Sequence, residues 1–229
     1  VVYDLGCGDG RIVVAAAKSF GARGVGIDIN PDRIKEANAN AKKEGVENLV
    51  RFEENDLFKA QIGEATVVTL FLLSSINLKL RPKLLADLKP GTRIISHDYP
   101  ISPLQYERVV SFDSEEKLKI SGTTLTVLYL YLIPARIGGE WNLTLGLPGP
   151  GTKPVTLRFD QKPEGATGSV ELGGTRIPLR DLRVAGEEIS FTFNSGGSPL
   201  TLGGNVKGTA MSGNVLPPGT TLTWSASKK

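Results

Sequence analysis

The chain has 229 residues, of which 40% are hydrophobic and 22% are charged, and its formal net charge at pH 7 is +3. This composition is typical of a globular protein with an apolar core, and the small net charge gives no argument for nucleic-acid binding. Cys7 is the single cysteine, which excludes an internal disulfide. No apolar run approaches the ~20 residues that a membrane-spanning helix needs. The first residue, a valine, already stands in a predicted strand, so we expect a further segment ahead of it.

Residues 1 to about 135 alternate short apolar runs with helical patterns, which predicts a parallel sheet with helices on both faces. The predicted strands are 1–4, 24–29, 49–53, 66–72 and 92–97. The predicted helices are 10–20, 31–43 and 78–88. The second of these helices has Asn30 as its cap and Pro31 at its first position, and it stops at Gly45.

The end of this first part breaks the alternation. The ranges 107–112 and 123–133 both have strand character, and no helical pattern is visible between them. They therefore predict an antiparallel hairpin that closes the sheet. The α/β class and a first domain over residues 1–135 follow from this pattern.

From about Gly138 the helical periodicity ends, and short strand-like runs alternate with Gly, Pro, Asn and Ser. This spacing predicts a small antiparallel β domain over residues 138–229, either a barrel or a sandwich. The sequence LPGPGTKP, residues 147–154, predicts either a hairpin loop or a flexible tip. The stretch GGEWNL is weakly similar to the first strand of lipocalin-like and avidin-like barrels, in which Trp141 would close one end. The simpler interpretation is a tryptophan in the core.

The sequence VYDLGCGDGR places Gly6, Gly8 and Gly10 between a predicted strand and a predicted helix. Such a loop brings backbone close to a ligand, and the helix N-terminus adds N–H donors. The dinucleotide-binding fingerprint needs another glycine at the position of Arg11. Asp4, ahead of the loop, would repel a diphosphate and attract an ammonium group. The loop therefore indicates a ligand with an amine and no diphosphate, and S-adenosyl-L-methionine fits this description.

Two further strands end near an acid. Asp28 lies about 20 residues past the loop, where a carboxylate can accept hydrogen bonds from both ribose hydroxyls. Ile29 can pack on the adenine, and Asp56, with Leu57 beside it, can accept from the adenine amino group. The carboxyl ends of parallel strands share one edge, so these residues should converge. Taken singly, the glycine turn can be only a tight turn, and each acid can be only a helix cap.

The stretches YDLGCGDGR, GVGIDINPDRI, FEENDLF and LKPGTRIIS resemble the ordered motifs of class I S-adenosylmethionine-dependent methyltransferases. Within that class they are similar to the small protein-lysine methyltransferases of archaea and mitochondria. The resemblance covers residues 1–135 and implies a Rossmann-like, seven-stranded sheet whose last strand is antiparallel. It places the three glycines along the cofactor, Asp4 at its methionine part, Asp28 at its ribose and Asp56 at its adenine. It also implies a helical segment ahead of the first strand, which this sequence does not contain.

The acceptor side is expected at the ends of the fourth and fifth strands. FLLSS lacks the Asn/Asp-Pro-Pro-aromatic motif of enzymes that methylate planar amide or base nitrogens, which disfavours DNA adenine and protein glutamine. In SHDYP, His97 is a candidate general base, Asp98 a carboxylate for an incoming lysine ammonium, and Tyr99 an apolar wall with a polar tip. The alternative is that His97 only ends the strand and Tyr99 only packs. Three basic residues of the preceding helix favour a solvated face over a phosphate track: Lys79, Arg81 and Lys83.

We therefore predict an S-adenosylmethionine-dependent methyltransferase that acts on a protein lysine, with a small-molecule methyltransferase as the alternative. A second hypothesis is a cofactor-binding scaffold without chemistry, because FLLSS carries no decisive substrate motif. A nicotinamide oxidoreductase is the third, and Arg11 disfavours it.

No metal site, nucleic-acid partner or membrane partner is expected. Because the cofactor is a cytosolic metabolite, we expect the cytoplasm. The β domain has three open roles: substrate presentation, binding of a small apolar ligand, and association. The sequence does not indicate an oligomeric state.

Overall fold

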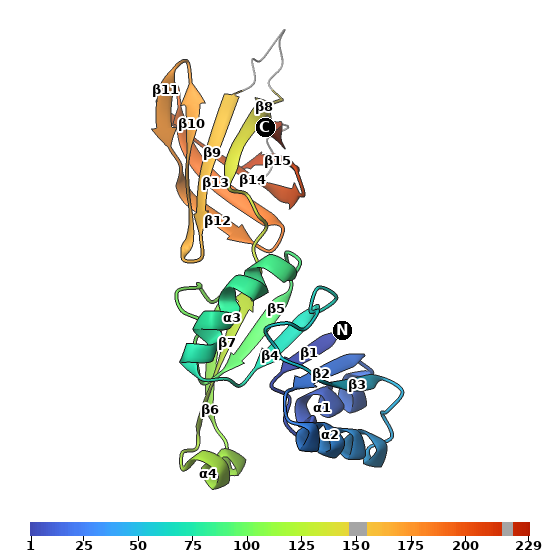
Figure 1. Cartoon of the computed structure of the whole chain (residues 1–229). Helices are drawn as coiled ribbons and strands as arrows, with labels where there is room; N and C mark the ends of the chain where they lie inside the picture. Colours follow the sequence, from blue (N-terminus) through green and yellow to red (C-terminus); the bar gives the residue numbers. More distant parts are fainter. Residues whose placement is uncertain (147–154, 217–221) are drawn as a thin grey trace. The chain divides into compact units, whose positions relative to one another are not determined.

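The computed structural model describes residues 1–146, 155–216 and 222–229, and the chain forms two compact units, Val1–Ile133 and Pro134–Lys229 (Figure 1). The hairpin loop predicted over residues 147–154 lies outside the described residues. Within the described ranges, no helix is both long enough and apolar enough to span a bilayer.

The first unit contains a seven-stranded sheet in the order β3-β2-β1-β4-β5-β7-β6. The five strands from β3 to β5 are parallel, and β7 is antiparallel to both β5 and β6. The strands are β1 (Val2–Leu5), β2 (Gly24–Asp28), β3 (Val50–Glu54), β4 (Val67–Leu70), β5 (Arg93–His97), β6 (Arg108–Asp113) and β7 (Leu125–Leu132). The predicted Rossmann-like sheet with an antiparallel last strand is confirmed.

The helices of this unit are α1 (Arg11–Phe20), α2 (Pro31–Lys43), α3 (Ser74–Asp87) and α4 (Glu115–Ser121). The start of α2 is as predicted, because the Asn30 side chain accepts a hydrogen bond from the Asp32 N–H at 2.9 Å. Helix α3 starts at Ser74 and not at residue 78. Its first turn could not be predicted because the residue ahead of it, Leu73, carries no capping side chain.

The expectation of no helix between the last two strands is wrong. Strands β6 and β7 do pair antiparallel, but α4 stands between them in the chain. A helix of seven residues is too short to show an apolar repeat in the sequence. Its other signals are local: Glu115 and Glu116 in the first turn, and Gly122 with a left-handed φ of 75° at its end.

The first unit is held by two apolar clusters. The larger joins the central strands to α3, with buried residues such as Leu5, Ile27 and Leu70 from the sheet and Leu80 and Leu84 from the helix. The second joins α1 and α2 to β3 through Val14, Ala41 and Phe52, among others. This two-sided burial explains why the central strands are continuous runs of Val, Ile and Leu.

The second unit is one nine-stranded antiparallel sheet in the order β11-β10-β9-β8-β16-β15-β14-β13-β12. Its strands are β8 (Gly139–Leu145), β9 (Val155–Lys162), β10 (Gly165–Leu172), β11 (Thr175–Pro178), β12 (Arg180–Ala185), β13 (Glu188–Ser195), β14 (Ser198–Lys207), β15 (Ala210–Leu216) and β16 (Thr223–Lys228). Leu179, between β11 and β12, donates its N–H to the Gly168 oxygen of β10 at 2.9 Å. The two ends of the strand order therefore approach each other, which gives the predicted barrel-like domain.

Large aromatic side chains fill the interior of this barrel. Trp141, Phe191, Phe193 and Trp224 are buried in one apolar cluster, and the Trp141 ring N–H donates to the Ile137 oxygen at 2.7 Å. The simpler interpretation of GGEWNL, a tryptophan in the core, is confirmed. A packed interior of this kind disfavours a small apolar ligand inside the barrel.

Candidate functional site

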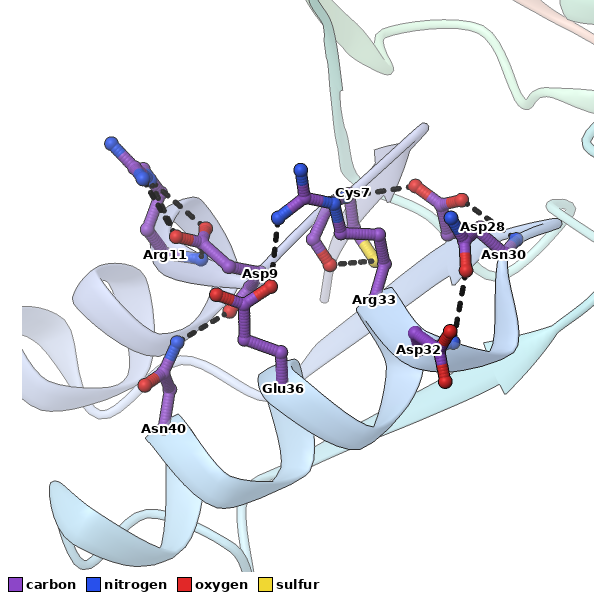
Figure 2. A network of polar contacts seen from close by, with 10 residues as sticks. Cys7, Asp9, Arg11, Asp28, Asn30, Asp32, Arg33, Glu36 and Asn40 are labelled. Atoms are coloured by element: carbon purple, nitrogen blue, oxygen red, sulfur yellow. Dashed lines mark hydrogen bonds and ion pairs between the residues drawn. The ribbon is translucent and has the colours of Figure 1, made fainter.

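The glycine loop after β1 is fastened to the carboxyl end of β2. Gly6 and Cys7 both donate their N–H groups to the Ile27 oxygen, at 2.8 and 2.9 Å. Asp28, the last residue of β2, accepts the Gly8 N–H on one carboxylate oxygen at 2.9 Å and the Asn30 N–H on the other at 3.0 Å (Figure 2). The Asp28 carboxylate is therefore held in one orientation between the loop and the start of α2.

The three glycines of the loop all have a positive φ, of 83°, 54° and 74° in chain order. A Cβ on Gly6 would lie 2.9 Å from the Leu72 side chain, and one on Gly10 would lie 2.6 Å from Phe52 and 2.8 Å from Ala37. A Cβ on Gly8 would meet nothing within 4 Å. Gly6 and Gly10 thus permit close packing, whereas Gly8 exposes its backbone to open space. Gly10 supplies the tight helix contact for which the dinucleotide fingerprint uses a later glycine.

Further polar contacts join this loop to α1 and to α2 (Figure 2). Asp9 forms an ion pair with Arg11 at 2.6 Å, and its backbone oxygen accepts a hydrogen bond from the Asn40 side chain at 3.0 Å. Arg11 is therefore a surface partner of the loop and takes no part in helix packing. The Cys7 thiol is buried, and burial, together with the charges of Asp4 and Asp28, raises its pKa to about 12. At neutral pH the Cys7 thiol is therefore protonated, which disfavours a role as a nucleophile.

Asp4 lies inside β1, in register between Gly26 of β2 and Thr69 of β4. Its side chain is buried, and it accepts a hydrogen bond from the Thr69 hydroxyl at 2.6 Å. Burial raises the pKa of Asp4 to about 6, against the opposing effect of the Thr69 hydrogen bond. A buried carboxylate without a cation is costly, and an ammonium group placed beside it would remove that cost.

The residues after β3 reach the same edge of the sheet. The Asn55 N–H donates to the Asp28 backbone oxygen at 2.9 Å, which ties the end of β3 to the end of β2. Asp56 accepts the Phe58 N–H at 2.9 Å, which is the local turn contact that the simpler interpretation of an acid at a strand end expects. Ile29 is 72% exposed, whereas Leu57 packs against the main core. Ile29 is therefore free to contact a ligand over this edge.

The acceptor residues predicted from SHDYP stand at the end of β5. The ring of Phe71, from the end of β4, stacks on His97 with 4.1 Å between the ring centroids. Burial lowers the pKa of His97, and the imidazole is therefore neutral at neutral pH. Its Nε2 is buried and has no hydrogen-bond partner among the described residues. The nearest carboxylate oxygen, Oδ2 of Asp98, lies 3.6 Å away.

Asp98 has a left-handed backbone with φ 60°, and its side chain is engaged on both oxygens. Oδ2 forms an ion pair with Lys117 Nζ of α4 at 2.6 Å, and Oδ1 accepts the Val127 N–H at 3.1 Å. Burial raises the pKa of Asp98, but these two hydrogen bonds and the neighbouring positive charges outweigh it and hold the pKa below the usual value. Asp98 is therefore an anion that already holds one lysine ammonium.

The backbone of Tyr99 is fixed by buried polar groups. Its oxygen accepts hydrogen bonds from the Ser96 hydroxyl at 2.6 Å and from the Asn77 amide at 3.1 Å, and its N–H donates to the His97 oxygen at 2.8 Å. Asn77 belongs to α3, so this helix determines how the chain leaves β5. The turn that carries the three predicted acceptor residues is thus held in place by hydrogen bonds from β5 and from α3.

A family model for the ANTKMT methyltransferase domain matches residues 4–108 of this chain. A protein-lysine N-methyltransferase of Saccharolobus islandicus is 44% identical over 134 residues, which is 58% of this chain and 79% of that relative. The chain belongs to the ANTKMT methyltransferase family.

Other relatives and neighbours of this chain bear the names of different acceptors. The adenine nucleotide translocase lysine N-methyltransferase of Mus musculus is 35% identical over 109 residues, which is 48% of this chain and 48% of that relative. The chain thus spans less than half the length of this mouse relative. A solved RNA methyltransferase from Salinibacter ruber, in complex with S-adenosyl-L-homocysteine, is 51% identical and covers 59% of this chain and 82% of its own, with a TM-score of 0.52.

As a member of this family, the protein is an S-adenosyl-L-methionine-dependent methyltransferase. The residues at the carboxyl edge of the sheet fit that cofactor. The buried Asp4 carboxylate suits an ammonium group, Asp28 is oriented by two N–H groups, and the backbone at Gly8 faces open space. The first hypothesis from the sequence is therefore confirmed for the cofactor and the enzyme class.

Three residues near the site were not singled out from the sequence. Thr69 donates to Asp4, Phe71 stacks on His97, and Lys117 pairs with Asp98. Each of these contacts joins two different elements of the fold, so neither partner predicts the other from its place in the chain. Thr69 and Phe71 lie at the end of β4, where an acceptor side was expected, but Lys117 carried no signal because a lysine among glutamates is typical of a solvated helix.

Proposed function

We propose that this enzyme transfers the methyl group of S-adenosyl-L-methionine to the ε-amine of a protein lysine. The observation that supports this acceptor is the imidazole of His97 at the end of β5, whose Nε2 lies 3.6 Å from the carboxylate of Asp98. The pKa of each of these two groups is lowered from its ordinary value. The carboxylate can bind an incoming ammonium group, and the imidazole can accept the proton that this group loses. The archaeal relative that is 44% identical bears the name of a protein-lysine N-methyltransferase.

On this proposal, the cofactor lies over the ends of β1, β2 and β3. Asp4 receives the ammonium of its methionine part, and Gly6, Gly8 and Gly10 lie along it. Each Asp28 oxygen accepts one N–H and keeps a free lone pair, so the two oxygens bind the two ribose hydroxyls. The adenine-binding residues are those after β2 and β3: Ile29, Asp56 and Leu57.

The bound cofactor supplies an electrophilic methyl group on its sulfonium. Asp98 holds the lysine ammonium at the end of β5, and His97 accepts the proton that the ammonium loses. A bond then forms between the lysine nitrogen and the methyl carbon while the carbon–sulfur bond breaks, which leaves methyl-lysine and S-adenosylhomocysteine. Phe71 keeps the imidazole in place by stacking on its face, and Tyr99 provides a wall beside the aliphatic part of the lysine.

RNA is the second candidate acceptor, because the Salinibacter ruber neighbour at 51% identity is named an RNA methyltransferase. The acceptor edge offers little to a phosphate backbone. Asp98 is an anion there, and two of the three basic residues of α3 are engaged within the domain: Arg81 donates to the Ser102 oxygen, and Lys83 pairs with Asp87. These contacts favour a protein acceptor. Because the cofactor is a cytosolic metabolite, we also propose that the reaction takes place in the cytoplasm.

The test is methyl transfer from labelled cofactor to separate pools of protein and RNA, followed by digestion and mass spectrometry. We expect label in methyl-lysine, with a loss of about 10²-fold or more in rate for His97→Ala and for Asp98→Asn. Lys79→Met, on α3, is the matched surface control and should not change the rate. Label in methylated nucleosides would replace lysine by RNA as the acceptor. Cofactor binding without transfer to either pool would favour a small-molecule acceptor, the alternative that the sequence left open.

A further inference from the structure

Helix α4 buries one of its two lysines and exposes its leucine. The Lys117 side chain is 9% exposed, while Leu118 beside it is 50% exposed. The other charged residues of the helix, Glu115, Glu116 and Lys119, are also exposed. A short helix that packs against a domain normally does the reverse, with its apolar residue inward. Among the described side chains of α4, the one that turns inward is therefore an ammonium group and not an apolar residue.

The Lys117 ammonium extends from α4 to the acceptor residues. It pairs with Oδ2 of Asp98 at 2.6 Å, and it donates a further hydrogen bond to the Leu125 oxygen at the start of β7. Asp98 directly follows β5, next to His97. The side chain thus brings a primary ammonium on a four-carbon chain to the carboxylate that the proposed function assigns to the substrate lysine.

We propose that Lys117 occupies the acceptor-lysine site as an internal substitute, and that the lysine of a substrate protein displaces it from Asp98. This inference rests on the proposed function, because it takes the acceptor to be a lysine. It makes α4 a removable cover of the acceptor site. The enzyme then selects lysines that compete with Lys117 for one carboxylate.

The state of His97 supports this assignment independently. Its Nε2 is buried without a hydrogen-bond partner among the described residues, 3.6 Å from the Asp98 oxygen that Lys117 occupies. Buried ring nitrogens are normally paired, so this atom is left ready to pair with one more polar group near Asp98. Lys117 donates to Asp98 and to the Leu125 oxygen. A substrate ammonium, which has no link to β7, is free to offer a donor to Nε2.

An amine titration tests the inference without any turnover. His97 is the only histidine of the chain, so its ring protons give a single identifiable set of NMR signals. We titrate n-butylamine into the wild-type protein, Lys117→Met and the matched control Lys119→Met, which changes an exposed lysine of the same helix. We expect the apparent Kd from the His97 signals to be at least tenfold lower in Lys117→Met than in the other two. Adding Asp98→Asn to Lys117→Met should remove this gain.

Equal amine affinity in Lys117→Met and wild type, or a weaker affinity in the variant, would overturn the inference, because Lys117 would then only position Asp98. The dispersion of the remaining proton signals confirms that each variant is folded. A second measurement uses methyl transfer to a lysine-rich protein. Here Lys117→Met should lower KM several-fold with kcat nearly unchanged, and an increase in KM would contradict the inference.

The two measurements separate the inference from the function on which it rests. If lysine transfer occurs in the wild-type protein but neither Kd nor KM responds to Lys117→Met, the proposed function stands and the internal substitute is wrong. If the variant gains amine affinity as expected but no protein lysine is methylated, the ammonium site stands and the proposed acceptor is wrong.

Discussion

At the residue scale, Asp4 links proton binding to cofactor binding. Because the pKa of Asp4 is about 6, its carboxyl group is protonated in part of the molecules near that pH. An ammonium group that binds next to it favours the ionised form. We therefore expect the affinity for S-adenosyl-L-methionine to rise as the pH increases from about 5 to 7, and to level off before the cofactor amine itself loses its proton near pH ~7.7. Titration calorimetry in two buffers of different ionisation enthalpy measures both the affinity and the proton released. An affinity independent of pH below about 6 would contradict the assignment of Asp4 to the amine.

The same carboxylate should reduce the stability of the free protein at neutral pH. Its folded pKa of about 6 lies above the unfolded value of 3.8, so the folded state binds more protons between these values, and this contribution to stability is lost as the pH rises through that window. The loss is about 3 kcal/mol at most. Asp4→Asn removes the charge, and we expect it to unfold at higher urea concentration than the wild type at about pH 7.5 while it loses cofactor affinity. A less stable Asp4→Asn would show that the buried charge is compensated.

Two glycines of the loop should respond differently to one added methyl group. In Gly10→Ala the new Cβ meets Phe52 and Ala37 below 3 Å at a φ of 74°, so we expect a loss of stability of about 2–4 kcal/mol. In Gly8→Ala the Cβ meets nothing, so only the left-handed backbone costs energy, about 1 kcal/mol. Cofactor affinity, in contrast, should fall in Gly8→Ala because its Cβ points into the open space over the loop. Urea unfolding and calorimetry on the same two variants test this, and equal stability losses would argue against it.

The positions of residues with a local signal could be predicted from the sequence, whereas contacts between distant positions could not. The loop glycines, Asp4 and Asp28 stand at fixed offsets from strand ends, and those offsets alone place them at one edge of a parallel sheet. The Asp98–Lys117 pair depends on how a hairpin folds back on β5, which no spacing encodes. The sequence thus offered Asp98 as a candidate for an incoming lysine ammonium but did not identify the ammonium that the chain itself places there.

At the scale of elements, the start of α2 combines a helix cap with a site residue. The Asn30 side chain caps the helix by accepting the Asp32 N–H, while the Asn30 backbone N–H donates to Asp28. Asn30→Ala removes only the cap, so we expect it to cost about 1 kcal/mol of stability. Cofactor affinity should change less than twofold, because the backbone N–H that orients Asp28 is retained. Differential scanning calorimetry and a cofactor titration measure the two quantities, and a large drop in affinity with intact stability would contradict this separation.

The bounds of a helix could be predicted where its own sequence contains capping residues. Helix α2 has Asn, Pro and an acid at its start, and both its ends match the prediction. Helix α3 has Leu73 where a capping side chain would stand and Pro82 in its interior, so its first turn was missed. Helix α4 has only seven residues, and periodicity therefore had nothing to detect.

At the scale of the whole molecule, the two units differ in what they can bind. In the first unit, two N–H groups orient the Asp28 carboxylate at the carboxyl edge of the sheet. The methyltransferase family model matches residues of this unit only. The second fills its interior with aromatic side chains, so its described surface, and not its centre, is available to partners. Presentation of a protein substrate and association are the roles that this packing leaves for the second unit, while its fold alone selects neither.

The division into two units predicts two separate unfolding transitions. Each unit has its own apolar clusters, and both tryptophans of the chain, Trp141 and Trp224, lie in the second. Tryptophan fluorescence should therefore follow the barrel alone, whereas far-ultraviolet circular dichroism near the helical bands follows the first unit. Saturating S-adenosyl-L-methionine, at about 100 times its Kd, should shift the dichroism transition by about 2.7 kcal/mol and leave the fluorescence transition in place. The control is Asp28→Ala, in which the cofactor should shift neither transition. If the cofactor shifts both transitions of the wild type equally, the units unfold as one, and the β domain then contributes to the stability of the cofactor-binding unit.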